Sequence, residues 1–452
     1  MRVGLRVLVG LAVAALVASA GAVSPQEKPQ DAVARRYRQS TTAYQAHDFA
    51  AFLAETRAVV AIVPDHPRYL YNLACRLALT GEGGEAVRVL ERLVAMGLTF
   101  DVAADEDFAS LRGTPGFAEV KARMDALKEP AGEARRAFSL ADPQFIPEGI
   151  AHDPADGSFF VGSVRKREIV RVKKNGLAER IAGREKGLDS VLGMAVDPAR
   201  RALWACSSAL PEMEGYAAAD EGRAALVRIE LPAGKPVRRI PIPTGGGVHN
   251  CNDLAVGPSG EVYVADSVGG ALYRLPPSGQ TLEEWVPSGT FRLPNGLAIG
   301  EGGGGGGRLY VSDYAAGLFA VDLGSRTATP LAHPHDLVLR GIDGLTAVPG
   351  RPGTLLAIQN GIRPYRVLRL DLGPDGLAVT GGEVLLRSHP DFDEPTLGVV
   401  VGDRLFLVAN SHWNRIGADH ALPPAAELTP PIVLELAVWP AVRTAQTPTK
   451  TE

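Results

Sequence analysis

The sequence predicts an all-β propeller of six blades preceded by a small all-α helical repeat. Apolar residues recur at intervals of three and four positions in roughly the first quarter of the chain. Beyond it the period changes to two, and one strand-turn-strand unit then occurs six times. The 51 Gly and 34 Pro among 452 residues are typical of a chain with many tight turns. This length also favours more than one domain.

The first twenty residues have the pattern of a secretion signal. Arg2 and Arg6 precede an apolar run at about 7–17, and Ala-Ser-Ala at 18–20 fits the small-x-small rule of signal peptidase. We therefore expect a signal peptide at 1–20, with cleavage after Ala20. A single membrane anchor is the alternative, but the run is shorter than the roughly 20 residues that span a bilayer. The pattern predicts export to a periplasm or the extracellular space, without stable membrane insertion.

Residues 31–127 are expected to form helical repeats. Shifting 43–66 by 34 residues places it on 77–100, and the expected turn at 46–48 then falls on the one at 80–82. Thirty-four is the tetratricopeptide period, so the segment resembles tetratricopeptide repeats, although it lacks their full consensus. Such a segment either binds a protein partner or packs against its neighbouring domain.

The propeller is expected at 145–440, after a polar linker at 128–144 and before a disordered tail at 441–452. Its repeat units begin 43 to 60 residues apart, an interval that suits four-stranded antiparallel blades. Six blades close a ring that leaves no long free edges.

Charge and composition bound the partners. The chain has 47 basic and 51 acidic residues, a net charge of -4, and no block of like charges. This balance argues against nucleic acid or an anionic membrane surface as a partner and favours small or neutral molecules.

The three cysteines have no metal-binding spacing, and an odd number cannot all pair with one another. Cys75, Cys206 and Cys251 are interpreted as buried thiols. An exported compartment permits a disulfide, so a bridge between Cys206 and Cys251 is the alternative.

A ring of oxygen ligands is predicted on the propeller axis. The innermost strand of each blade begins at the central channel, so the first residues of the six units converge there. In order, these residues are Glu148, Leu192, Asn252, Asn295, Asp343 and Thr396. Two carboxylates and two amides suit a hard divalent cation, and Ca²⁺ fits a set without nitrogen or sulfur donors best, with Mg²⁺, Mn²⁺ and Zn²⁺ as alternatives.

A turn function is the competing interpretation, because Asp and Asn before Gly often bond to nearby backbone amides. Four such residues at one register favour a metal, since two facing carboxylates would repel each other without it. Thr396 completes the ring as a candidate substrate contact. His249, three residues before Asn252, is either a proton carrier in the cavity or a loop residue.

Four short segments carry a resemblance to a known family. They are Pro-Glu-Gly at 147–149, Asn-Asp-Leu-Ala-Val-Gly-Pro-Ser-Gly at 252–260, Pro-Asn-Gly-Leu-Ala at 294–298 and Asp-Gly-Leu at 343–345. In this order they resemble the six-bladed propellers of the gluconolactonase, regucalcin and luciferin-regenerating enzyme superfamily. The resemblance spans roughly 145–440. The related paraoxonase-type propellers, which hydrolyse lactones and aryl esters on a calcium ion, share a similar Asn-Asp strand.

The resemblance implies one divalent metal held by Glu148, Asn252, Asn295 and Asp343, with Asp343 also acting as the catalytic general base. One departure concerns substrate. Sugar-lactone hydrolases of the family carry an arginine two residues before the second motif's asparagine, and Asn250 stands at that place here. Asn250 becomes a candidate substrate contact, and a sugar lactone is disfavoured.

The sequence thus predicts an exported, metal-dependent hydrolase of a lactone or another cyclic or activated ester. The alternative is a non-catalytic propeller with a structural metal that binds a ligand, with the helical repeats docking a protein partner. A third interpretation is a silent relative without a metal.

Overall fold

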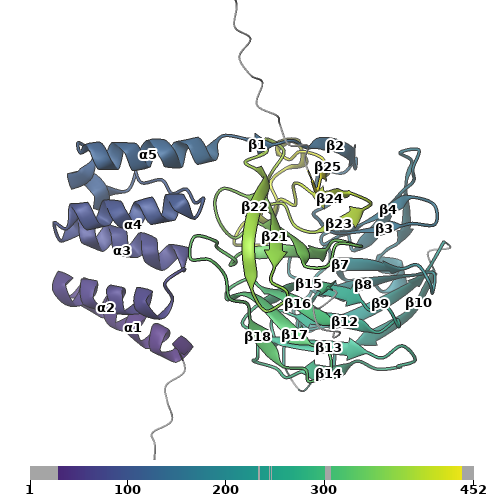
Figure 1. The fold of residues 1–452 in the computed structure, drawn as a ribbon. Coiled ribbons are helices and arrows are strands. Elements are labelled where there is room, and N and C mark those ends of the chain that lie inside the picture. Colours follow the sequence, from purple (N-terminus) through teal and green to yellow (C-terminus); the bar gives the residue numbers. More distant parts are fainter. Residues whose placement is uncertain (1–28, 233–234, 244, 246, 301–306, 440–452) are drawn as a thin grey trace, which may run out of the picture. The chain divides into compact units, whose positions relative to one another are not determined.

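The computed structural model describes residues 29–232, 235–243, 245, 247–300 and 307–439. The expected signal peptide, the expected C-terminal tail and residues 301–306 lie outside these residues (Figure 1). The chain divides between Val63 and Pro64 into two compact units. None of the described helices is long and apolar enough to cross a membrane.

The first unit contains a pair of packed helices, α1 (Pro29–Gln45) and α2 (Phe49–Ile62). Asp48 begins α2 as its N-cap, because its side chain accepts a hydrogen bond of 3.0 Å from the amide of Ala51. The predicted turn at 46–48 is therefore confirmed.

Three further helices open the second unit: α3 (Pro67–Leu79), α4 (Gly83–Ala95) and α5 (Pro115–Lys128), with the 3₁₀ helix η1 (Glu106–Leu111) before α5. The predicted turn at 80–82 joins α3 to α4, and Gly81 adopts a φ of 83° there. The second helical pair therefore also lies where the 34-residue period places it.

The rest of the second unit is a six-bladed propeller, as predicted. Each blade has four antiparallel strands, and β1 adds a fifth strand to blade 5 (Figure 1). The innermost strands are β3, β7, β11, β15, β19 and β23, each the first strand of its repeat unit. The strands of blades 1 to 3 are β3 (Pro147–Asp153), β4 (Ser158–Ser163), β5 (Glu168–Val172), β6 (Ala178–Ala182); β7 (Ser190–Asp197), β8 (Ala202–Ser208), β9 (Ala224–Glu230), β10 (Lys235–Pro241); β11 (Cys251–Val256), β12 (Val262–Asp266), β13 (Ala271–Leu275), β14 (Glu283–Val286). Those of blades 4 to 6 are β15 (Pro294–Gly300), β16 (Arg308–Asp313), β17 (Gly317–Asp322), β18 (Ala328–Pro330); β19 (Ile342–Ala347), β20 (Thr354–Gln359), β21 (Arg366–Leu372), β22 (Val379–Arg387) with β1 (Ala131–Gly132); β23 (Gly398–Val401), β24 (Arg404–Val408), β25 (Ile432–Ala437) and β2 (Arg135–Ser139).

Blade 6 closes the ring with a strand from before the propeller repeats. Strands β23 to β25 supply three of its members, and β2 adds the outer one by pairing with β25, with Arg135 opposite Glu435. The expected linker at 128–144 therefore contains two strands, β1, which pairs with β22, and β2, which pairs with β25. Both lie at the outer edges of their sheets, where they cover edges that would otherwise stay unpaired.

Apolar clusters fill the spaces between neighbouring blades. Leu203 and Ile229 of blade 2, for example, pack with Phe160 of blade 1, and equivalent clusters lie between the other neighbouring blades. Cys206 of β8 and Cys251 of β11 form a disulfide between blades 2 and 3, with their Cα atoms 5.1 Å apart. The interpretation of these two as buried thiols is wrong, because the two strands pack side by side in that cluster. Cys75 is a buried free thiol, as expected.

Candidate metal centre and adjoining cavity

The four predicted metal ligands occupy the same position in four blades. Each is the second residue of an innermost strand: Glu148 in β3, Asn252 in β11, Asn295 in β15 and Asp343 in β19. At this point the pairing with the next strand shifts register in all four blades. Such an irregularity re-aims side chains away from the regular ladder. The repeat therefore gives the four residues equivalent local geometry.

Glycines let neighbouring blades approach closely at this level. A Cβ atom added to Gly149 would lie 2.0 Å from the Leu192 carbonyl oxygen of the next blade, and one added to Gly296 would lie 2.5 Å from that of Asp343. Because real Cβ atoms do not approach backbone atoms this closely, only glycine fits. The Gly that follows a ring residue in the sequence is thus a packing requirement of the propeller.

Hydrogen bonds join three of the predicted ligands in a chain. The side-chain amide of Asn252 donates to Asn295 Oδ1 over 2.9 Å, and the side-chain amide of Asn295 donates to Asp343 Oδ1 over 3.1 Å. The other oxygen of Asp343 accepts a bond of 2.6 Å from Asn360. The structure therefore brings Asn252, Asn295 and Asp343 together.

Glu148 belongs to the same end of the axis. Its Oε2 accepts a bond of 2.7 Å from the indole nitrogen of Trp413, and Thr396 donates to its backbone oxygen over 2.9 Å. The hydroxyl of Thr396 is thus used to join blade 6 to blade 1.

Four carboxyl groups act on one another here. Burial, followed by the charge of Asp343, raises the pKa of Glu148 well above its usual value. Burial raises the pKa of Asp343 to about 6 and that of Asp253 to about 7, and burial with the nearby Asp343 also raises the pKa of Glu394. The physical cause is the same throughout: carboxylates held out of water and close together disfavour their charged forms.

Asp253, Asn360, Glu394 and Trp413 were not among the predicted site residues. In four of the six repeat units the ring position is followed by glycine, but Asn252 is followed by Asp253. This departure from the repeat is visible in the sequence and could have marked Asp253 as a site residue. Its carboxylate accepts a bond of 2.9 Å from the Leu297 amide. The other three come from segments outside the innermost strands, where the repeat gives no register.

A cavity of about 1110 Å³ adjoins this cluster. Its lining includes Tyr314, Asn360, Glu394 and Trp413. Two of these bond directly to predicted ligands, Asn360 to Asp343 and Trp413 to Glu148. A molecule in the cavity would therefore lie beside the carboxylates.

A second cavity, of about 360 Å³, lies between later residues of the innermost strands. Its walls include the apolar side chains of Ile150, Met194, Leu254 and Leu345. Its lining includes Asp253, but like the larger cavity it is lined by none of the four predicted ligands, and its lining lacks Asn360 and Trp413, which bond to two of them.

His249 and Asn250 form a separate group in blade 3. His249 Nδ1 lies 2.6 Å from the carboxylate of Asp266, which also accepts a hydrogen bond of 3.0 Å from the backbone N–H of Asn250. The side chain of Asn250 donates to Ser267. No described hydrogen bond joins these two residues to the ring, and neither lines the 1110 Å³ cavity. Their role in substrate binding stays a prediction.

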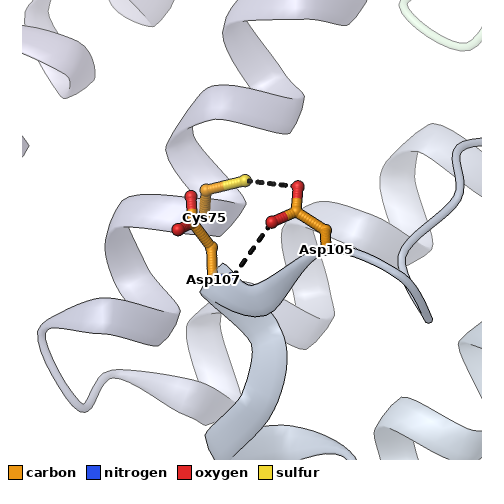
Figure 2. A group of neighbouring side chains, drawn as sticks. All are labelled: Cys75, Asp105 and Asp107. Atoms are coloured by element: carbon orange, nitrogen blue, oxygen red, sulfur yellow. Dashed lines mark hydrogen bonds between the residues drawn. The ribbon is translucent and has the colours of Figure 1, made fainter.

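Cys75, Asp105 and Asp107 also gather within metal-binding distance of one another (Figure 2). Asp105 is the N-cap of η1 and accepts from the Asp107 amide over 3.0 Å, while its other oxygen accepts from Tyr71 over 2.6 Å. Burial raises the pKa of the Cys75 thiol, so it stays protonated and is a poor ligand. Helix capping accounts for this group.

No family model and no curated protein matches the chain. Its fold is similar to that of solved six-bladed propellers at low identity. A gluconolactonase from Xanthomonas campestris is 19% identical over 69% of this chain and 92% of its own, with a TM-score of 0.46. Regucalcin from Agrobacterium tumefaciens, a calcium-binding protein, is 17% identical over 68% and 93%, with a TM-score of 0.46.

The PQQ-bound aldose sugar dehydrogenase from Streptomyces coelicolor is equally similar, with 17% identity over 68% and 98% and a TM-score of 0.46. The six-bladed β-propeller and the N-terminal helices are given by the strand order and the elements of the structure itself.

Proposed function

We propose that this chain is an exported, divalent-metal-dependent hydrolase of a lactone or ester, with Ca²⁺ as the preferred ion. The observation that carries the proposal is the buried carboxylate cluster beside a large cavity. The disulfide between Cys206 and Cys251 supports export, because such bonds persist in oxidising compartments.

The donor set fits a hard cation. Glu148 and Asp343 are 4% and 6% exposed, and the charges that act most on Glu148 are those of other carboxylates. Buried like charges are costly unless a cation neutralises them. Glu148, Asn252, Asn295 and Asp343 would hold it through oxygen atoms, which suits Ca²⁺.

The chain's own residues would divide the reaction between them. A divalent cation bound at this place would polarise the substrate carbonyl and lower the pKa of a bound water. Asp343 would accept the proton of the attacking water and return it to the leaving alkoxide as the acyl carbon–oxygen bond breaks. Asn360 would hold Asp343 in place through its 2.6 Å bond. The products are a carboxylic acid and an alcohol, joined in one molecule when the substrate is a lactone.

A ligand-binding propeller with a structural metal is the second candidate. The observation that favours it is that both carboxylate oxygens of Asp343 already accept amide hydrogen bonds, as expected of a rigid and fully partnered site. This candidate predicts bound metal without turnover.

Metal content and hydrolysis of the mature protein test the proposal. We expect about one equivalent of divalent metal in the wild type and turnover of lactones or aryl esters that chelation abolishes. Asp343→Asn should lose the metal and at least a hundredfold of kcat/KM. Asp403→Asn, the same change at an exposed position, is the matched control and should alter neither.

Metal without turnover on a broad panel would favour the ligand-binding propeller. Absence of metal from the wild type after equilibration with millimolar Ca²⁺, Mg²⁺, Mn²⁺ and Zn²⁺ would exclude the proposed centre.

A further inference from the structure

The cavity beside the carboxylates has a wall that the propeller does not supply. Besides propeller residues, its lining includes 98–101, which follow α4, together with Pro67 and Arg68 of α3 and Lys128 at the end of α5. The helical segment of the second unit, residues 64–128, is therefore placed to contact whatever the cavity holds, and the term helical segment refers to these residues below. The loop between β8 and β9, by contrast, contributes none of the described lining residues.

Hydrogen bonds fix this wall to blade 5. The Thr99 amide donates to the Arg363 carbonyl over 3.0 Å, and the guanidinium of Arg366 donates to the carbonyl of Met96 over 3.1 Å. Arg366 is 3% exposed, and Met96 is the C-cap of α4, where a cation complements the helix dipole. Ser388 bonds to the carbonyl of Leu127 in the same way. The wall is thus held from both ends of the stretch 96–127.

Phe100 is the aromatic residue of this wall. Its ring stacks on Tyr71 at a centroid distance of 4.4 Å and an angle of 14°, and Tyr71 is held by its bond to Asp105. The side chain is half-buried and lines the cavity. Its orientation is therefore fixed before any ligand arrives, which reduces the entropy lost on binding.

The lining of the cavity is chemically mixed. Asn360 and Trp413 bond to the carboxylates of Asp343 and Glu148, whereas Phe100, Ile362 and Phe392 supply apolar surface. Its 1110 Å³ is at the upper limit for pockets that hold drug-sized ligands. A substrate that consists of one small hydroxylated ring would leave most of this volume unfilled and would place its hydroxyl groups against apolar side chains.

We propose that the helical segment forms part of the substrate site, and that Phe100 selects substrates with a bulky apolar group, aromatic or aliphatic, attached to the reacting carbonyl. This inference rests on the proposed hydrolase function, because that function places the carbonyl at the carboxylates. Phe100 is a specificity-determining residue, and the helical segment recognises substrate.

Calorimetric binding of product-like acids to the calcium-loaded full chain tests the wall without turnover. We expect 4-phenylbutyrate to bind the wild type more tightly than acetate does. Phe100→Ala should weaken 4-phenylbutyrate about tenfold or more and leave acetate unchanged, because the lost contact is apolar. Phe49→Ala, at a 39% exposed phenylalanine of α2, is the matched control. Phe100→Leu keeps an apolar group and should lose less.

Hydrolysis of phenylbutyryl and acetyl esters by the same variants supplies the second readout. Phe100→Ala should lower kcat/KM for the phenylbutyryl ester about tenfold and leave the acetyl ester unaffected. Three results would contradict the proposal that Phe100 contacts the apolar group of the substrate. They are equal effects on both ligands, equal effects of Phe100→Ala and Phe49→Ala, and no binding of 4-phenylbutyrate at millimolar concentration. Phe100-dependent binding without any ester turnover would instead contradict the proposed hydrolase function, while the role of Phe100 in ligand binding would remain supported.

Discussion

At the scale of single residues, the site depends on small side chains as much as on its carboxylates. Gly149, Gly193, Gly296 and Gly344 each follow a ring position and each lie against the next blade. In blade 3 the equivalent residue is Asp253, and its carboxylate occupies the space that Gly193 leaves open. In four of the six blades, the close approach of the next blade at this level therefore requires a residue without a side chain after the ring position.

Gly149→Ala tests this packing. Its new Cβ would meet the backbone oxygen of Leu192, which cannot rotate away, so we expect unfolding in urea to show a loss of roughly 1–3 kcal/mol. Because Gly149 adjoins Glu148, metal content should fall as well. Gly113→Ala is the control, since its Cβ would have no neighbour within 4 Å, and its stability should change by less than about 0.5 kcal/mol. Equal stability of the two variants would show that the blades are not in close contact here.

At the scale of elements, the residues before α3 are tied to the propeller by a charged pair. The carboxylate of Asp65 lies 3.5 Å from Nε2 of His333, just after β18, and 3.8 Å from the guanidinium of Arg340. The hydrogen bond to His333 lowers the pKa of Asp65 to about 2, and the same bond raises the pKa of His333. Burial lowers the pKa of the adjacent His66 to about 4, so that ring is neutral near pH 6.

The two shifts define a pH window. Asp65 has a depressed folded pKa, so its contribution is present above its unfolded value of 3.8 and is lost as the pH falls through about 2. His333 has a raised folded pKa, so its contribution is present below its unfolded value of 6.5 and is lost as the pH rises through the folded value. The pair therefore stabilises most between about pH 4 and 6.5.

Asp65→Asn should remove this contribution. Urea unfolding at pH 5 should show a loss of about 2 kcal/mol relative to the wild type, and the difference should shrink both below pH 4 and above pH 7. Asp403→Asn, at an exposed position, should show no such profile. A difference that stays constant across this range would mean that the charge of the pair does not stabilise the fold.

At the scale of the whole molecule, periodicity predicted what repeats and missed what occurs once. The turns at 46–48 and 80–82 and the starts of β3, β11, β15 and β19 follow from intervals visible in the sequence. The partner of β25 does not, because β2 is a short polar strand from 300 positions earlier, and its role depends on ring closure. Asn360 and Trp413 likewise reach the site only through tertiary packing.

The helical segment illustrates the same limit. Its period predicts the helices but not the contact with blade 5, which includes a hydrogen bond from one buried arginine, Arg366, to the end of α4 about 270 positions away. The hydrogen-bond acceptor of a buried arginine within a predicted strand cannot be identified from the sequence, because here it is a backbone carbonyl that is distant along the chain. The sequence therefore leaves open whether the segment packs against the propeller; the structure shows that residues 96–127 contact blade 5, and a protein partner stays a prediction.

The disulfide joins two blades and so affects the stability of the ring. Cys206 and Cys251 are 45 positions apart, and closing a loop of that length stabilises the folded chain by about 4 kcal/mol through the entropy of the unfolded state. The double variant Cys206→Ala, Cys251→Ala should lower the free energy of unfolding by an amount of that order. The purified protein, unfolded in denaturant without reduction, should react with one equivalent of a thiol reagent, at Cys75, and with three equivalents after reduction. Three equivalents before reduction would show that the bond does not form, and the argument that it makes for an oxidising compartment would then fail.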